Sequence, residues 1–296
     1  MSHNGVPPGE TIQVDWRAPG YLMVIGGADR LDPKAAIAKL FLQHVALTEA
    51  NSSQRDIVLV SSATRHPTVL TDDYRRIFER LGVERSKVHA PLIRNHDEAN
   101  HDDIAELLGS AAGIYITGGD QYLLTQVLDR TPAEKAIRHA YLQGAIVAGT
   151  SAGATAMGRP MIVAGGGTGE LRLGVVQMSG GLGWVGEDTI IDTHFGARGR
   201  FPRLASAVAE HPEALGIGVD ENTCLLVDAN KHCTIEGTGV AYFVDGSHAQ
   251  LNSAHKTRPG HALSIGSLAV TALSAGGKYD LINRSVILEK AEKVRV

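Results

Sequence analysis

The segment AIVAGTSAGATAM, residues 145–157, begins as a short apolar run and continues into small residues that can open a helix. Between the two, residues 149–153 match the pattern Gly-x-Ser-x-Gly, which marks a sharp turn from a strand into a helix. Small neighbours let the chain lift the Ser151 hydroxyl clear of the sheet, and the next backbone N–H, from Ala152, then faces the carbonyl under attack. We predict Ser151 to be a nucleophile and Ala152 an oxyanion donor. The simpler alternative is a Gly-rich turn whose serine caps a helix.

The chain before this turn alternates between apolar runs and helical patterns. Strands are predicted at 21–25, 57–60, 88–93, 113–117 and 145–148, and helices at 33–50, 72–81, 102–108, 122–128 and 133–143. Such alternation with short connections is typical of an α/β fold, a mainly parallel sheet flanked by helices. Ligands of these sheets bind beyond the carboxyl ends of the strands. Gly26-Gly27, Ser61-Ser62, Gly118-Gly119 and Ser151 are therefore expected on one rim.

The second half of the chain has a different pattern. Residues 161–186 are rich in glycine and are predicted to form loops and turns. A helix is expected at 204–210, and closely spaced strands at 189–192, 215–219, 224–227, 240–244, 264–272 and 280–288. No linker rich in proline or serine separates the halves. We therefore predict one domain over residues 1–296, with a core at about 20–220 and a β-rich, mostly antiparallel C-terminal part at about 221–290.

Composition excludes several classes of protein. The 296 residues are 43% hydrophobic and 20% charged, which excludes a disordered chain, a coiled coil or a small disulfide scaffold. A net charge of -4 favours neither a nucleic-acid nor a membrane partner. Residues 1–16 lack the apolar stretch of a signal peptide, so a cytoplasmic protein is expected. Cys224 and Cys233 do not match a CxxC site and are predicted to be buried thiols.

A nucleophilic serine needs a base and a carboxylate that orients it. The chain has 13 histidines, and His194 is the best placed because it follows the predicted strand at 189–192. The alternative is a solvated or core histidine. Asp220 or Glu221, at the end of the predicted strand 215–219, can supply the carboxylate, although both are also common turn residues. The order Ser…His…acid differs from the Ser…acid…His order of the α/β-hydrolases.

Two polar segments are candidates for substrate binding. Three arginines, Arg198, Arg200 and Arg203, lie within a span of six residues soon after the predicted base, and clustered guanidinium groups favour a carboxylate or phosphate ligand. A solvated basic turn is the alternative. The segment GGDQ at 118–121 follows another strand, so that the Gly119 N–H is a second candidate oxyanion donor and Gln121 a candidate substrate contact.

Two further segments resemble ligand sites without the residues such sites need. The glycines at 165–169 lack the Gly-Lys-Ser/Thr of a P-loop and are predicted to form a flexible loop. His96 and His101 have acidic neighbours, but a spacing of five does not place both on one helix face, so a solvated helix start is expected. We expect neither a metal nor a cofactor.

Five segments in order resemble the cyanophycinase branch of the S51 serine peptidases, relatives of aspartyl dipeptidase. They are VIGGAD at 24–29, TGGDQ at 117–121, GTSAGA at 149–154, DTHFGARGRFPRL at 192–204 and GIGVDENT at 216–223. The resemblance extends from about residue 20 to 290. It implies a flavodoxin-like or class I glutamine-amidotransferase-like core and a homodimer. A glutamine amidotransferase itself would have cysteine in place of Ser151.

The resemblance also implies a reaction. Its triad is Ser151, His194 and Glu221, and its substrate is cyanophycin, a poly-aspartate backbone with arginine on each β-carboxylate. An exopeptidase of this kind releases β-Asp-Arg dipeptides through an acyl-enzyme. Alternatives are a hydrolase of aspartyl dipeptides or other β-linked peptides, and a non-catalytic peptide binder.

The same resemblance assigns the substrate's carboxylates to Gln121, Arg198, Arg200 and Arg203. Asp192 is expected to meet the substrate's arginine. The family's usual Asp-Gln-His-Phe is Asp192-Thr193-His194-Phe195 here, so Thr193 places a shorter hydroxyl where a glutamine amide would contact substrate. The expected consequence is a change in substrate affinity or preferred chain length.

Overall fold

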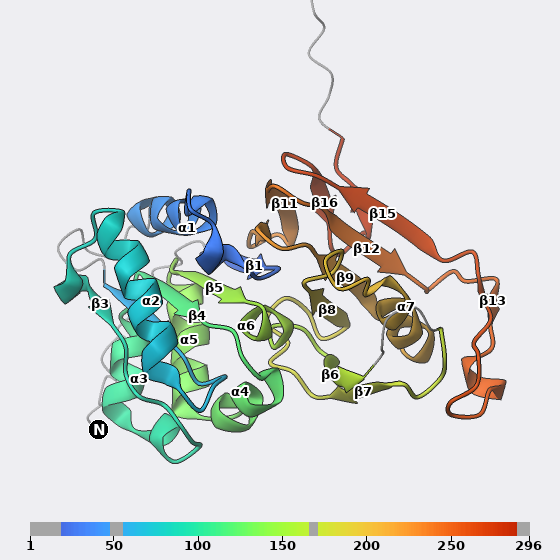
Figure 1. The fold of residues 1–296 in the computed structure, drawn as a ribbon, viewed down its shortest axis with the longest axis horizontal. Helices are drawn as coiled ribbons and strands as arrows, with labels where there is room; N and C mark the ends of the chain where they lie inside the picture. Colours follow the sequence, from blue (N-terminus) through green and yellow to red (C-terminus); the bar gives the residue numbers. More distant parts are fainter. Residues whose placement is uncertain (1–18, 48–55, 166–170, 289–296) are drawn as a thin grey trace, which may run out of the picture.

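The computed structural model describes residues 19–47, 56–165 and 171–288, and its centre is a mixed sheet of nine strands (Figure 1). Their order is β17-β16-β11-β10-β1-β5-β4-β2-β3. The parallel strands are β1 (Leu22–Ile25), β2 (Ile57–Val60), β3 (Val88–His89), β4 (Gly113–Ile116) and β5 (Ile146–Thr150). The run β3-β2-β4-β5 has the flavodoxin-like order, and the first strand of the chain takes the fifth position.

Helices cover both faces of this sheet, as the sequence predicts. The longer ones are α1 (Ala36–Leu47), α2 (Pro67–Arg80), α3 (Asp102–Gly109), α4 (Gln121–Leu128) and α5 (Pro132–Leu142), with the short α6 (Ala152–Thr155) after β5. Alternate strand residues face opposite layers. Met23 and Ile25 pack with α1 and α2, whereas Leu22 and Val24 pack with α3 to α6.

The C-terminal half extends the main sheet and builds a second one. Antiparallel strands β10 (Thr223–Val227), β11 (His232–Gly237), β16 (Lys278–Asp280) and β17 (Ser285–Val286) continue the main sheet beyond β1. The second sheet has the order β15-β12-β9-β8, with β8 (Thr189–Thr193), β9 (Leu215–Val219), β12 (Ala241–Asp245) and β15 (Ala269–Leu273). Helix α7 (Phe201–Glu210) packs on it.

Short elements complete the described chain. They are the hairpins β6 (Met161–Gly165) with β7 (Val176–Ser179) and β13 (Leu251–Asn252) with β14 (Ile265–Gly266), and the 3-10 turns η1 (Asp29–Leu31), η2 (Arg85–Lys87), η3 (Glu98–Asn100) and η4 (Ala254–Lys256). No helix among the described residues is both long and apolar enough to span a membrane.

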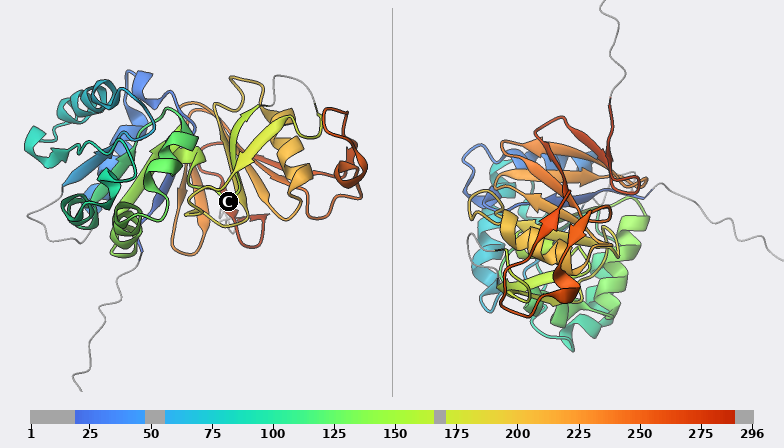
Figure 2. Two further views of the ribbon diagram at one scale, coloured as in Figure 1. Left: turned by 90° about the horizontal axis from the view of Figure 1, so that it is seen from below. Right: turned by 90° about the vertical axis from the view of Figure 1, so that its right-hand side faces the viewer.

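The two sheets share one hydrophobic core and lie side by side (Figure 2). Ile191 and Ile217 of the second sheet pack in the same cluster as Val24 of the main sheet. Phe243 of β12 stacks on Tyr279 of β16 with ring centroids 3.9 Å apart. The chain thus contributes β8 and β9 to one sheet, β10 and β11 to the other, and then returns with β12.

Several expected elements have different bounds. The glycine-rich stretch 161–186, predicted as loops, contains the hairpin β6–β7, whose Met161, Ile162 and Val176 are buried. Met161 and Ile162 are adjacent and both buried, and the register shifts between Ile162 and Ala164, so β6 lacks the alternation that predicts a strand. The glycine-rich loop at 165–169 lies outside the described residues except for Gly165.

Local hydrogen bonds account for other differences. The helix predicted from Pro33 begins at Ala36, because the Asp32 carboxylate accepts from the backbone N–H groups of Lys34 and Ala36. Only two parts of the strand predicted at 280–288 are strand, Asp280 at the end of β16 and Ser285–Val286 in β17, because the Asp280 carboxylate accepts from the N–H groups of Ile282 and Asn283 in a turn.

Both cysteines are buried and unpaired with each other, as predicted. Burial raises the pKa of the Cys233 thiol to about 12 and that of Cys224 further. Both remain neutral apolar groups at physiological pH.

Candidate active site

Ser151 lies at the turn between β5 and α6, in a conformation that serine rarely adopts, with φ 53° and ψ -113°. Its N–H donates to the carbonyl of Ile25 at the end of β1, at 3.0 Å. Glycine is required before it, because a Cβ at Gly149 would lie 2.6 Å from the backbone of Gly153. The predicted strand–turn–helix geometry is therefore present, and it presents the serine side chain at the rim of the sheet.

Two further side chains complete a hydrogen-bonded line. The Ser151 Oγ lies 2.9 Å from Nε2 of His194, and Nδ1 of the same ring lies 2.6 Å from Oε1 of Glu221. His194 follows β8, and Glu221 follows the neighbouring strand β9. The N–H of His194 donates to the carbonyl of Gly26, the residue after Ile25. Consecutive carbonyls at the end of β1 thus hold the backbones of both the serine and the histidine.

The neighbouring carboxylate, Asp220, has a different role. Its two oxygens accept from the N–H groups of Gly196 at 2.7 Å and Val240 at 3.1 Å. It therefore ties the turn after His194 to the second sheet. Of the two acids that the sequence left open, Glu221 contacts the imidazole.

The surroundings of His194 favour its neutral form. Burial lowers the pKa of the imidazole, and the nearby cation Arg198 lowers it further, whereas the hydrogen bond that the ring donates to Glu221 raises it. A neutral ring with Nδ1 as donor leaves Nε2 free to accept the serine proton. The ring can therefore serve as a base at neutral pH.

Backbone N–H groups lie next to the serine. A Cβ at Gly118 would lie 3.2 Å from the Ser151 Cβ, so the loop after β4 passes against this side chain. Gly119 has φ 144°, and a Cβ there would lie 2.1 Å from the carbonyl of Ala63, in the loop after β2. The predicted convergence of strand ends on one rim is thus present. Ala152 begins α6, so its N–H has no acceptor within the helix.

The three clustered arginines are in two different environments. Asp192 of β8 is buried and receives Arg200 Nη1 at 3.1 Å and Arg203 Nε at 2.9 Å, with a second contact from Arg203 Nη2. Arg200 also donates to the carbonyl of Thr193 at 2.6 Å. The side chains of Arg200 and Arg203 are only 16% and 11% exposed. Arg198 is exposed and has no ion pair among the described residues.

Comparison with known proteins identifies the family of this chain. The family model described as "Peptidase family S51" matches residues 22–235. The chain belongs to peptidase family S51. It is 36% identical over 268 residues to a cyanophycinase of Trichormus variabilis, covering 90% of this chain and 87% of that protein. It is 35% identical over 262 residues to a cyanophycinase of Geminocystis herdmanii, covering 88% and 93%.

A solved structure shares the fold. A peptidase from an acI-B1 Actinobacterium has a TM-score of 0.66 and 22% identity, with 90% of this chain and 98% of that chain covered. The family membership makes this protein a peptidase, and the five sequence segments that resemble the S51 family lie within the region of similarity to its relatives.

Two expected substrate contacts of the S51 peptidase have partners within the protein. The amide nitrogen of Gln121, the first residue of α4, donates to the carbonyls of Ile162 at 2.8 Å and Val163 at 3.1 Å. Its donors therefore anchor β6, and the amide oxygen remains as an acceptor. The buried Thr193 hydroxyl lies 3.5 Å from that of Thr155 in α6.

One residue of this site was missed by sequence reasoning. The carboxylate of Asp29 is buried beneath the elbow and accepts from the hydroxyls of Tyr74 at 2.9 Å, Tyr115 at 2.5 Å and Thr150. Burial, and then the charge of Asp29, raise the pKa of both tyrosines, which keeps them protonated donors. Asp29 lies in VIGGAD, one of the five segments that resemble the S51 family, and this was a signal that it belongs to the site. Its role could not be predicted, because its hydrogen-bond partners come from distant parts of the chain.

Candidate metal ligands do not converge. Within the described ranges no three His, Cys, Asp or Glu side chains form a group that could hold a metal ion. His96 and His101 are exposed.

Proposed function

We propose that this S51 peptidase hydrolyses cyanophycin to β-Asp-Arg dipeptides with Ser151 as the nucleophile. The observation that carries the proposal is the line of hydrogen bonds from Ser151 Oγ through His194 to Glu221, at 2.9 and 2.6 Å. The substrate is inferred from relatives that are named cyanophycinase and that align over about 90% of the chain.

The proposed mechanism follows from this geometry. Neutral His194 takes the proton of Ser151 as the oxygen attacks an α-peptide carbonyl of the aspartate backbone. Glu221 holds the ring and stabilises the imidazolium. The N–H groups of Ala152 and Gly119 stabilise the oxyanion, a contribution of about 3 kcal/mol for each donor in related sites. The imidazolium protonates the leaving amine, and water attacks the acyl-enzyme with His194 again acting as base.

Substrate recognition is proposed for the residues around this line. Arg198, exposed and unpaired with acid in the described chain, is the guanidinium best placed to bind a substrate carboxylate. We assign Arg200 and Arg203 to the same carboxylate site, with Asp192 orienting their planes. The oxygen of Gln121 can accept from the substrate's arginine. Thr193 is buried with its hydroxyl 3.5 Å from that of Thr155, and we expect this shorter side chain to change substrate affinity or preferred chain length.

The decisive experiment is incubation with purified cyanophycin followed by mass analysis of the products. Release of β-Asp-Arg by the parent and its loss in Ser151→Ala, with an unchanged circular dichroism spectrum, would support the proposal. Cleavage of Asp-Xaa dipeptides without cleavage of cyanophycin would instead identify a dipeptidase. Binding without cleavage of either would identify a peptide binder.

The homodimer and the cytoplasmic location are proposals that rest on the family resemblance alone. A homodimer is expected to elute in size-exclusion chromatography with light scattering at about twice the chain mass of 31.3 kDa. Elution at the single-chain mass would contradict it. Cell fractionation of the source organism tests the expected cytoplasmic location.

A further inference from the structure

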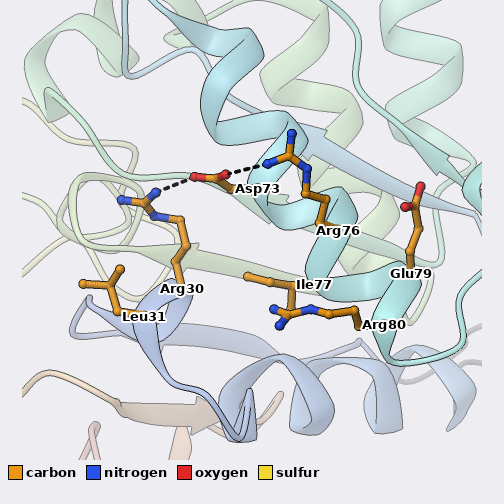
Figure 3. Close-up of a pocket in the computed structure, with 7 residues that line it drawn as sticks. All are labelled: Arg30, Leu31, Asp73, Arg76, Ile77, Glu79 and Arg80. Atoms are coloured by element: carbon orange, nitrogen blue, oxygen red, sulfur yellow. Dashed lines mark hydrogen bonds and ion pairs between the residues drawn. The ribbon is translucent and has the colours of Figure 1, made fainter.

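An open groove of about 740 Å³ lies between η1 and α2, outside the triad (Figure 3). Its lining includes Arg30, Leu31, Asp73, Arg76, Ile77 and Arg80. The groove is open to solvent, and the apolar Leu31 and Ile77 lie among its charged residues. Such a shape is suited to an extended chain rather than to an enclosed small molecule.

The chain connects one end of the groove to the segment that contacts His194. A Cβ at Gly27 would lie 2.4 Å from Cε1 of His194, and Arg30 is three residues further along the chain. Arg30 forms an ion pair with Asp73 on α2. Because α2 follows the carboxyl end of β2, its later residues lie progressively farther from the rim that carries the triad. The groove therefore leads away from the active site along α2.

The charges of the groove leave guanidinium groups available. The side chain of Arg76 is 70% exposed, and its Nη1 lies 3.7 Å from Oδ1 of Asp73, which makes a long and weak ion pair. The same carboxylate also pairs with Arg30. Arg80 is exposed and forms no ion pair among the described residues. The other acid, Glu79, is held by Arg85 at 2.8 Å. The guanidinium groups of Arg76 and Arg80 are thus available, and such groups bind carboxylates through two parallel N–H donors.

The spacing of these arginines matches a polymer with carboxylate-bearing branches. Arg76 and Arg80 are one helical turn apart on one side of α2, a rise of about 6 Å. In an extended backbone, residues two apart face the same side and are separated by about 6.6 Å. Each branch of a multi-arginyl poly-aspartate ends in a free carboxylate. Successive same-side branches therefore reach successive arginines.

We propose that this groove is a second binding site, which holds the segment of polymeric substrate adjacent to the segment in the active site. The inference rests on the proposed cyanophycin specificity. In this proposal, Arg76 and Arg80 bind the free carboxylates of the polymer's arginine branches. Asp73 binds a guanidinium of the same polymer once its ion pair with Arg30 opens. The groove strengthens binding of long chains and leaves the chemical step unchanged.

The test compares long and short substrates in matched variants. Arg76→Ala/Arg80→Ala is expected to raise KM for cyanophycin about five-fold, in the range of two exposed ion pairs, with kcat unchanged. KM for the shortest β-Asp-Arg oligomer that the enzyme cleaves is expected to stay the same. The effect should vanish at about 1 M salt, where exposed charges are screened.

The control is Lys256→Ala/Arg258→Ala, which removes the same charge from exposed residues at the far end of the molecule, beyond β13 (Figure 1). This variant should behave as the parent on both substrates. An unchanged polymer KM in the groove variant would overturn the proposal. An equal rise for the short oligomer would also overturn it, because the arginines would then act on the active-site segment.

Sedimentation separates this inference from the proposed function. Ser151→Ala and Ser151→Ala/Arg76→Ala/Arg80→Ala are mixed with cyanophycin granules, and the bound fraction is measured. Weaker binding of the second protein supports the groove even if the parent fails to cleave the polymer. Equal binding of both excludes the groove even if cleavage is observed.

Discussion

Ser151 and His194 both have positive φ, at 53° and 50°, which costs conformational energy in residues other than glycine. Neighbouring carbonyls of β1 hold them there, since Ile25 accepts from the serine and Gly26 from the histidine. The relative position of the proposed nucleophile and base is thus set by two consecutive peptide groups. Side chains around these groups then set the protonation state and the orientation of the pair.

Arg198 is predicted to lower the pH at which the enzyme becomes active. The base works when neutral, so kcat/KM rises with pH through the pKa of His194, which burial and Arg198 hold below the usual 6.5. Arg198→Ala removes a cation that opposes protonation, so the acid limb should move to higher pH. A pH profile of kcat/KM measures this shift. An unmoved acid limb would contradict the electrostatic role, whatever happens to KM.

Thr150 is predicted to position the nucleophile through Asp29. Thr150→Val keeps the shape of the side chain and removes its hydrogen bond to the buried carboxylate. We expect a loss of about 1 kcal/mol in stability and a fall in kcat of about ten-fold through misplacement of Ser151, with little change in KM. Steady-state kinetics and urea unfolding measure both effects.

Tyr74→Phe is the matched control, because it removes another donor to Asp29 that is remote from the elbow in sequence. A similar loss of stability with unchanged kcat is expected. If both variants lowered kcat equally, the effect would belong to the whole buried network and not to the link between Thr150 and Ser151.

At the scale of elements, the site depends on how β8, α7 and β6 are joined. The Asp192 carboxylate at the end of β8 binds Arg200 before α7 and Arg203 within it. Arg203 also donates to the carbonyl of Gly165 in β6, at 3.3 Å. One buried acid therefore connects three elements around the substrate site, and Gln121 adds a link from α4 to β6.

Asp192→Asn is predicted to destabilise the protein by about 3 kcal/mol, because it leaves two largely buried guanidinium groups without a counter-charge. Thermal and denaturant unfolding measure the loss. Arg198→Ala, which removes an exposed guanidinium from the same turn, should change stability by less than about 0.5 kcal/mol. Equal stability of Asp192→Asn and the parent would show that the arginines do not need this acid.

At the scale of the molecule, the two sheets share a core, and the residues that we propose for catalysis come from both. Ser151 follows the main sheet, whereas His194 and Glu221 follow strands of the second sheet. The stack of Phe243 on Tyr279 is one contact across that boundary. A rigid junction between the sheets is therefore a condition for a formed triad.

Phe243→Ala is predicted to lower stability by about 3–5 kcal/mol, the usual cost of removing a buried aromatic ring. Because the sheets share their core, calorimetry should show one transition at a lower temperature in the variant. Two separated transitions would contradict the proposal of a single domain.

The sequence alone determined the local chemistry of this protein and the periodicity of its main elements. Apolar alternation and glycine turns are short-range signals, so the parallel strands, the elbow at Ser151 and the segments that carry the family resemblance were readable without coordinates. The hairpin at 161–179 was missed because β6 lacks the alternation of a half-buried strand, and several ends shifted because side chains such as Asp32 cap them.

Only the tertiary structure decided which distant groups meet. It placed Glu221 on the imidazole and turned Asp220 to the backbone, although the two are neighbours in sequence. It gave Asp192 two arginines of its own chain and placed Asp29 beneath the elbow. These pairings depend on the direction of side chains and on burial across the shared core, which strand and helix periodicity do not encode.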